Sequence, residues 1–138
     1  MNATGVVAGR GVRGLVRTGV IAALATMLAV TLVAALAQAV GVDFEIPDGG
    51  ESIPVAGFAV VTGFFSLVGV VIAVALRRWT ARPAVPFLRT TAALTAVSLV
   101  PPTISGANAT TVTALLALHL VAAGVMIPAL TSSLRRPS

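Results

Sequence analysis

Residues 18–42 read TGVIAALATMLAVTLVAALAQAVGV, a run of 25 residues in which no side chain carries a charge. About 20 consecutive apolar residues are enough for a helix to cross the hydrocarbon core of a bilayer. Arg10, Arg13 and Arg17 precede this run, and Asp43 is the first charged residue after it. The run is therefore predicted to be a membrane-spanning helix with a basic flank and an acidic flank.

Two further uncharged stretches continue the pattern. Residues 52–76 form another run of 25, and residues 90–134 form a run of 45, which is long enough for two spans. Pro101-Pro102 and the turn-like sequence SGAN at 105–108 predict a break inside the longer run. The sequence thus predicts an all-α fold, a polytopic four-transmembrane-helix bundle. Its predicted parts are a basic arm (1–17), four spans (18–41, 54–77, 86–104 and 110–131), an acidic loop (42–53) and a tail (132–138).

Composition supports this class and excludes others. Charged residues make up 9% of the chain, against roughly 25% in soluble domains, and the mean hydropathy is +1.04. Cysteine is absent, which excludes disulfides and thiolate metal sites. The net charge of +5 does not indicate nucleic acid, because the arginines flank apolar runs. We expect their partner to be the anionic inner leaflet of the bilayer.

The placement of charge also predicts orientation. Basic residues in short loops are retained on the cytoplasmic side. Four spans place every arginine on one side of the membrane, so we expect both termini in the cytoplasm and a multi-pass protein of the cytoplasmic (inner) membrane. The acidic loop then faces outward. One alternative stays open: Ala37-Gln38-Ala39 after a basic, apolar start resembles a signal-peptide cleavage site, although the apolar run is longer than signal peptides usually have.

Small residues recur at helical spacing in the first two spans. Stripes of small side chains let helix backbones approach closely, which drives helix association in lipid. We interpret them mainly as packing within the bundle, with homodimerisation through a remaining stripe as the alternative. The stripes are Ala22, Ala25 and Ala29 on the first span, and Ala59 with Gly63 and Thr62 with Ser66, Gly69 and Ala73 on the second.

A count of residues inward from the outer ends of the spans places several polar side chains at one depth. His119 is the only ionisable residue deep in a span, and such residues are functional candidates. We expect the third-span face of Thr91, Thr95 and Ser98 to meet it. His119 is then either a proton-carrying or ligand-binding group, or a neutral ring hydrogen-bonded to a hydroxyl. The candidate polar layer is His119, Ser98, Thr95, Thr62, Ser66 and Thr31.

The outer loop holds all four acidic residues, Asp43, Glu45, Asp48 and Glu51. Their oxygens could bind a divalent cation or a partner, although the spacing does not match an EF-hand; the alternative is a solvated loop. Apolar Phe44, Ile46 and Ile53 indicate that the loop folds back on the mouth of the bundle. No carboxylate reaches the depth of His119, so we predict no catalytic residue, no metal site and no cofactor. GRGVRG at 9–14 formally matches a dinucleotide-binding pattern, but no strand precedes it, and we interpret it as part of a flexible basic arm.

The acidic outer loop, the arginine-rich inner loop, SLVPP at 98–102 and LHLVAAGVMIP at 118–128 are similar to those of an uncharacterised actinobacterial family of four-helix integral membrane proteins, a domain of unknown function. The resemblance runs from about residue 15 to 131. It implies the same fold and membrane location, and carries no activity or site residue.

Three functions remain open from the sequence. The first is a non-enzymatic membrane protein that acts through a partner protein or as a homo-oligomer, with the acidic loop and the small-residue faces as contact surfaces. The second is a small transporter or proton-coupled carrier that uses His119. The third is an intramembrane enzyme or cofactor-binding protein.

Overall fold

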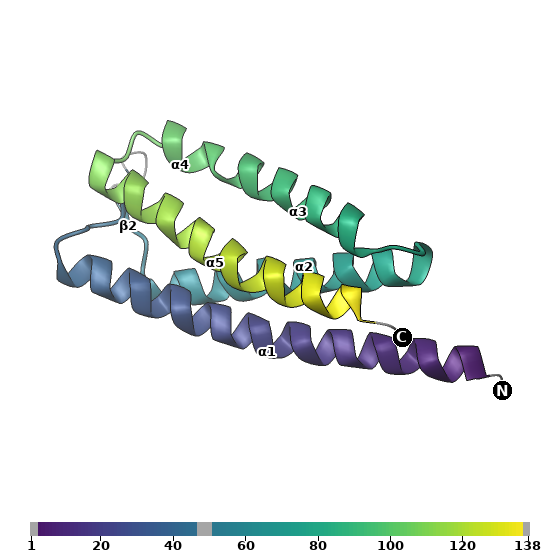
Figure 1. Cartoon of the computed structure of the whole chain (residues 1–138). Coiled ribbons are helices and arrows are strands. Elements are labelled where there is room, and N and C mark those ends of the chain that lie inside the picture. Colours follow the sequence, from purple (N-terminus) through teal and green to yellow (C-terminus); the bar gives the residue numbers. More distant parts are fainter. Residues whose placement is uncertain (1–2, 47–50, 137–138) are drawn as a thin grey trace.

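The computed structural model of the chain describes the backbone of residues 3–46 and 51–136, and the side chains of residues 11–46 and 52–136 (Figure 1). Its described part is helical apart from one two-stranded hairpin. Four of its helical segments are long and apolar enough to cross a membrane: 11–39, 55–79, 84–103 and 109–135. The prediction of an all-α fold with four such helices is confirmed, and these helices indicate a multi-pass membrane protein. The elements are α1 (Ala3–Ala39), β1 (Glu45–Ile46), β2 (Glu51–Ser52), α2 (Val55–Trp79), α3 (Ala84–Ser98), α4 (Val100–Ile104) and α5 (Ala109–Arg135).

The first helix differs from its predicted start. Helix α1 begins at Ala3 and runs without interruption for 37 residues, so the segment expected to be a flexible basic arm is continuous with the span. Arginine and valine do not end a helix, and no proline occurs before residue 40. Each glycine in this segment destabilises the helix by only about 1 kcal/mol relative to alanine. The helix can therefore continue past the bundle.

Helices α1 and α2 approach each other closely because of glycines. A Cβ atom added at Gly19 would lie 2.5 Å from Cγ2 of Val70, and one added at Gly63 would lie 2.9 Å from Sδ of Met27. Ala73, on the predicted second-span stripe, is fully buried. The small residues of α2 therefore serve packing within the bundle, as the sequence favoured.

Two apolar clusters form the core. One joins α1, α2, α3 and α5 through residues such as Leu15, Phe87 and Leu130. The other lies at the opposite end, where Phe44 and Val42 of the loop pack against α1 and α5. Strands β1 and β2 pair antiparallel beside it, with Glu45 opposite Ser52. Phe44 is fully buried, which confirms that the outer loop folds back on the bundle.

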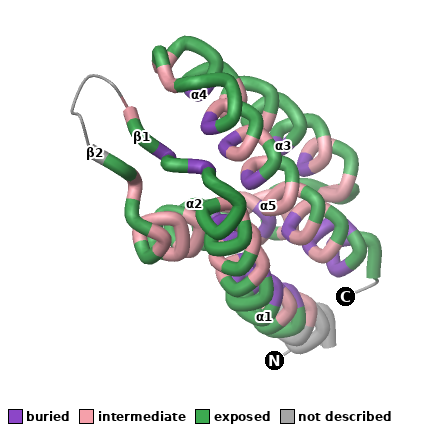
Figure 2. Tube along the Cα trace, turned by 90° about the vertical axis from the view of Figure 1, so that its left-hand side faces the viewer, coloured by how far each residue is buried: buried purple, intermediate pink, exposed green. Residues whose placement is uncertain are grey.

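The prolines of the third span follow the end of one helix and lie in the first turn of the next. Helix α3 ends at Ser98, and the short α4 follows with proline in its first turn, where a backbone N–H is not needed. The chain turns at 105–108, as predicted, before α5 begins. Of the residues in α3 and α4, Phe87, Thr91 and Pro102 are buried, and α3 packs mainly on α5. Figure 2 shows the two helices exposed along most of their length.

Both termini lie at the same end of the bundle as the connection between α2 and α3 (Figure 1). We call this the arginine end, because it carries Arg77, Arg78, Arg82, Arg135 and Arg136. We call the other end, with the β1–β2 hairpin and the α4–α5 turn, the acidic end. The separation of charge along the sequence is thus a separation in space.

Candidate functional site

His119 lies on the middle of α5 and is half-buried. Its Nδ1 is 2.7 Å from the backbone oxygen of Leu115, one turn earlier in the same helix. A ring nitrogen at this distance from a carbonyl carries the proton and donates it, because a carbonyl only accepts. The local helix therefore provides a hydrogen-bond partner for the imidazole without a second helix.

The hydroxyl groups of the predicted layer also bond within their own helices. Thr31 Oγ1 donates to the oxygen of Met27 at 2.6 Å, and Ser98 Oγ donates to the oxygen of Thr95 at 2.7 Å. Thr91, on the same face of α3, donates to Phe87 in the same way. Serine and threonine in an apolar helix commonly bond the carbonyl three or four residues earlier, because it is the nearest acceptor.

The predicted polar layer is therefore not joined by hydrogen bonds. Thr62 and Thr95 are half-buried and Ser66 is buried, each on its own helix. Among the described residues, His119 makes no hydrogen bond to any of the hydroxyls expected to meet it. The depth count predicts where the groups lie along the membrane axis, but the rotation of each helix decides which groups touch.

Asp43 is the centre of the polar contacts at the acidic end. Its Oδ1 accepts from Thr111 Oγ1 at 2.9 Å and from the backbone N–H of Glu45 at 3.0 Å. Its Oδ2 accepts from Asn108 Nδ2 at 3.2 Å. The bond from the Glu45 N–H, followed by the bond from Thr111, holds the pKa of the Asp43 carboxyl below its ordinary value, since these donors favour the charged form.

Asn108 joins this carboxylate to the start of α5. Its Oδ1 accepts from the backbone N–H of Thr111 at 2.8 Å, so it is the N-cap of the helix. The same side chain thus caps α5 and binds Asp43. The sequence analysis missed this arrangement, although a turn ending in asparagine before an apolar run is a recognised helix start.

The other predicted acidic residues do not extend this cluster within the described structure. Glu45 is exposed, and Asp48 and the side chain of Glu51 lie outside the described residues. No group of three or more His, Cys, Asp or Glu side chains in the described part of the chain could hold a metal ion. Of the described acidic residues, Asp43 is the one whose side chain joins the loop to α5.

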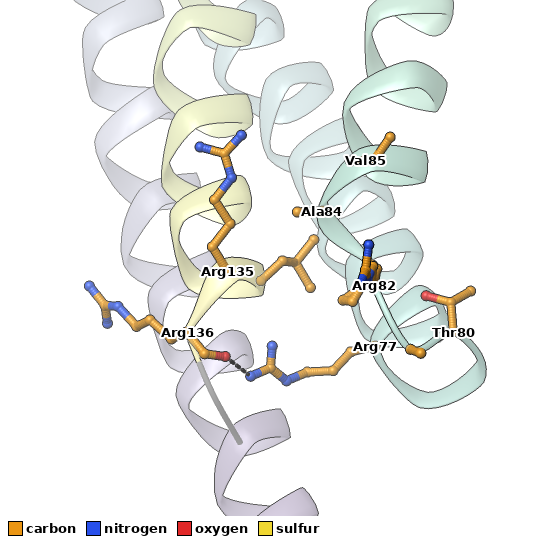
Figure 3. A pocket seen from close by; sticks show the side chains of 10 residues that line it. Arg77, Thr80, Arg82, Ala84, Val85, Arg135 and Arg136 are labelled. Carbon is orange, nitrogen blue, oxygen red and sulfur yellow. Dashed lines mark hydrogen bonds between the residues drawn. The ribbon is translucent and has the colours of Figure 1, made fainter.

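At the arginine end, Arg77 connects the end of α2 to the end of α5. Its Nη2 donates to the backbone oxygen of Arg136 at 3.0 Å, and its Nη1 donates to that of Ser133 at 3.4 Å (Figure 3). The last carbonyls of a helix have no partner within the helix, and basic side chains commonly satisfy them. This contact also escaped the sequence analysis, because it joins residues 56 and 59 positions apart.

The faces of the helices that point away from the bundle differ in side-chain size. On α1 this face is lined by leucines at every fourth position, including Leu24, Leu28 and Leu32. On α3 the exposed residues include Ala92, Ala93 and Ala96 as well as the bulkier Leu94 and Val97. Small side chains allow another helix to approach closely, whereas bulky ones suit contact with lipid chains. Exposed small residues therefore cluster on α3, where Ala92 and Ala96 are one turn apart, while Ala25 of the predicted first-span stripe is also exposed.

Comparison with known proteins finds a match over nearly the whole chain. Residues 10–136 match the model of DUF6069, a family of unknown function. No curated protein and no solved structure matches the chain.

Proposed function

The chain belongs to the DUF6069 family, and from the geometry above we propose that it is a non-enzymatic protein of the cytoplasmic membrane that acts by association in the membrane plane. In this proposal both termini and the arginine end face the cytoplasm, because short basic loops stay on that side. The associated molecule is a second copy of the chain or another membrane protein, and the contact surface is the outward face of α3.

The single observation that supports the proposal is the incomplete packing of α3. This helix contacts the bundle along one side only, and Ala93 and Ala96 on its outer side are exposed. The hydrophobic effect does not drive helices together in a membrane, because lipid chains are as apolar as the helix surfaces. Close packing of helix backbones is what favours association. The exposed alanines of this loosely packed helix, which lie beside Leu94 and Val97, meet that requirement better than the leucine face of α1.

The geometry of His119 favours this proposal over a carrier. A transport site needs polar groups from several helices around one substrate, and His119 is hydrogen-bonded only to Leu115 of its own helix within the described structure. Ser98 and Thr31 are likewise bound to their own helices. None of these contacts forms a continuous polar path across the described helices.

Cysteine cross-linking tests the proposed surface, because the chain has no natural cysteine. We expect Ala96→Cys, in the full chain in native membranes, to form a disulfide-linked dimer, or a link to one partner, on mild oxidation. The control is Leu28→Cys, which is exposed on the bulky face of α1. Equal cross-linking of both variants, or none at Ala96→Cys and Ala93→Cys, would contradict the proposal.

A further inference from the structure

A pocket of about 450 Å³ opens at the arginine end, between the α2–α3 turn and the end of α5 (Figure 3). Four of its ten lining residues are arginines, and none is acidic. The sequence supplies no nearby acid either, since all four acidic residues lie in the segment from 43 to 51. The cationic lining residues are Arg77, Arg82, Arg135 and Arg136.

Arg77 has an unused donor beside this pocket. Two of its nitrogens bond backbone oxygens of α5, but its Nε is buried without a hydrogen-bond partner among the described residues. A buried donor on a charged group is costly when it is unpaired, more so than on a neutral group. The pocket therefore offers net positive charge to an oxyanion, and one of the arginines that line it has a donor still unpaired.

A second pocket, of about 380 Å³, adjoins the first through Arg135, which lines both. It lies between α3 and the last turns of α5, and its walls include Leu88, Ile127 and Pro128. In Figure 3 the side chain of Arg135 extends back along α5, away from Arg136. A partly apolar groove thus lies next to the cationic pocket, on the side of the membrane-spanning part of the helices.

Thr131 is a buried polar residue in the lining of this groove, which also includes Ser132 and Arg135. The residue is 5% exposed, lines the groove, and its Oγ1 has no hydrogen-bond partner among the described residues. Among the described residues, Thr131 is the one buried hydroxyl without a partner, which sets it apart from the exposed and half-buried hydroxyls. It lies between the arginines and the apolar wall, at the position where a ligand with a charged head and an apolar tail would carry ester or hydroxyl oxygens.

We propose that the two pockets together bind one anionic phospholipid. Its phosphate and negatively charged headgroup lie among Arg77, Arg82 and Arg135, and an acyl chain follows Leu88 and Ile127. Guanidinium groups suit this role because their planar N–H donors bind phosphate oxygens in pairs. Basic pockets between transmembrane helices are known to receive such headgroups. Free phosphate uses the arginines but leaves the groove and Thr131 without a partner.

The test is native mass spectrometry of the full chain in detergent, with dioleoylphosphatidylglycerol and dioleoylphosphatidylcholine as probes. We expect the wild-type protein to retain one phosphatidylglycerol molecule about tenfold more tightly than phosphatidylcholine, since hydrogen bonds between charged groups are individually worth that factor or more. Equal retention of the two lipids would overturn the proposal, and this comparison requires no variant to fold.

Two double variants with the same loss of charge locate the site. Arg82→Gln with Arg135→Gln removes two pocket arginines, whereas Arg78→Gln with Arg89→Gln removes two exposed arginines that do not line the pocket. We expect the first pair to abolish the preference for phosphatidylglycerol and the second to preserve it. An equal effect of both pairs would show general attraction to anionic lipid and overturn the proposal. Displacement of the lipid by millimolar inorganic phosphate would assign the pocket to free phosphate and overturn it as well.

Discussion

Individual glycines determine how closely the first two helices pack. Gly19 faces Val70 and Gly63 faces Met27, and in both pairs an added methyl group would overlap the opposing side chain. The opposing side chains respond differently, because valine is branched at Cβ and held near one rotamer whereas methionine is flexible. The sequence shows small residues on α2, but it does not show that Gly19 makes the tighter contact.

We therefore expect Gly19→Ala to lower the free energy of unfolding by about 1–3 kcal/mol, the range for overpacking a core. Gly63→Ala is expected to cost less, since Met27 can move aside. The measurement is reversible unfolding of the purified protein in mixed micelles. Gly124→Ala is the control, because nothing lies within 4 Å of the added atom. A stability loss at Gly63 or Gly124 as large as at Gly19 would refute this account.

His119 shows the limit of residue-scale reasoning from sequence. Its depth in the fourth span follows from counting, but its partner does not. In an apolar helix the nearest acceptor is the backbone carbonyl one turn earlier, and the ring of His119 donates a hydrogen bond to that of Leu115. Thr31 and Ser98 likewise donate to carbonyls of their own helices. The residues of the candidate polar layer are therefore not hydrogen-bonded to one another.

At the scale of the element, the hairpin at the acidic end depends on one side chain. Phe44 is fully buried and its ring meets that of Phe58 edge-on, with centroids 4.8 Å apart. Its φ of 51° lies in the left-handed region, which is unfavourable for a bulky residue. The burial of the ring offsets that strain and fixes where β1 begins.

Phe44→Ala is expected to release the hairpin while leaving the four helices folded. Removal of a buried phenylalanine costs about 3–5 kcal/mol, and here the loss falls on a short loop. The measurement is hydrogen exchange at the backbone N–H of Ile53, which donates to the oxygen of Phe44 at 3.0 Å. Exchange there should become much faster. The control is Ser52→Ala, at an exposed position; unchanged exchange in Phe44→Ala would show that the Asp43 contacts alone hold the hairpin.

The residues at which the helices begin and end were also known only from the structure. Pro101 and Pro102 indicate a break in the long uncharged run, and in the structure α3 ends at Ser98 and the prolines lie in the first turn of α4. Both positions are compatible with proline, because its missing N–H is not needed in the first turn of a helix. The turn that separates the third and fourth spans follows at 105–108, where Asn108 caps α5.

At the scale of the whole molecule, charge is divided between two ends. Arg77 and Arg82 lie at the end that carries both termini, and Asp43 and Glu45 lie at the other (Figure 1). An even number of spans places both termini and the α2–α3 turn on the same side of the membrane, so no arginine has to cross it. The positive-inside rule then predicts that the arginine end is cytoplasmic.

Cysteine labelling in intact cells tests this orientation. Ser52→Cys places a thiol at the acidic end, and Ala81→Cys places one in the α2–α3 turn; both positions are exposed. We expect a membrane-impermeant maleimide to label Ser52→Cys in intact cells, and Ala81→Cys only after the membrane is permeabilised. The cysteine-free wild type is the control. The reverse labelling pattern would invert the topology and place the arginine pocket outside.

The sequence by itself determined the number of long apolar helices and the division of charge between the two ends. Both follow from properties that act along the chain, the length of uncharged runs and the order of charged residues. The tertiary structure decided the rest: the docking of α3 by one side only, the contact of Gly19 with Val70, and the arginine pocket beside Thr131. These features depend on the rotation of each helix about its axis. In lipid that rotation is set by packing between side chains distant in sequence, and not by a hydrophobic pattern that one helix carries alone.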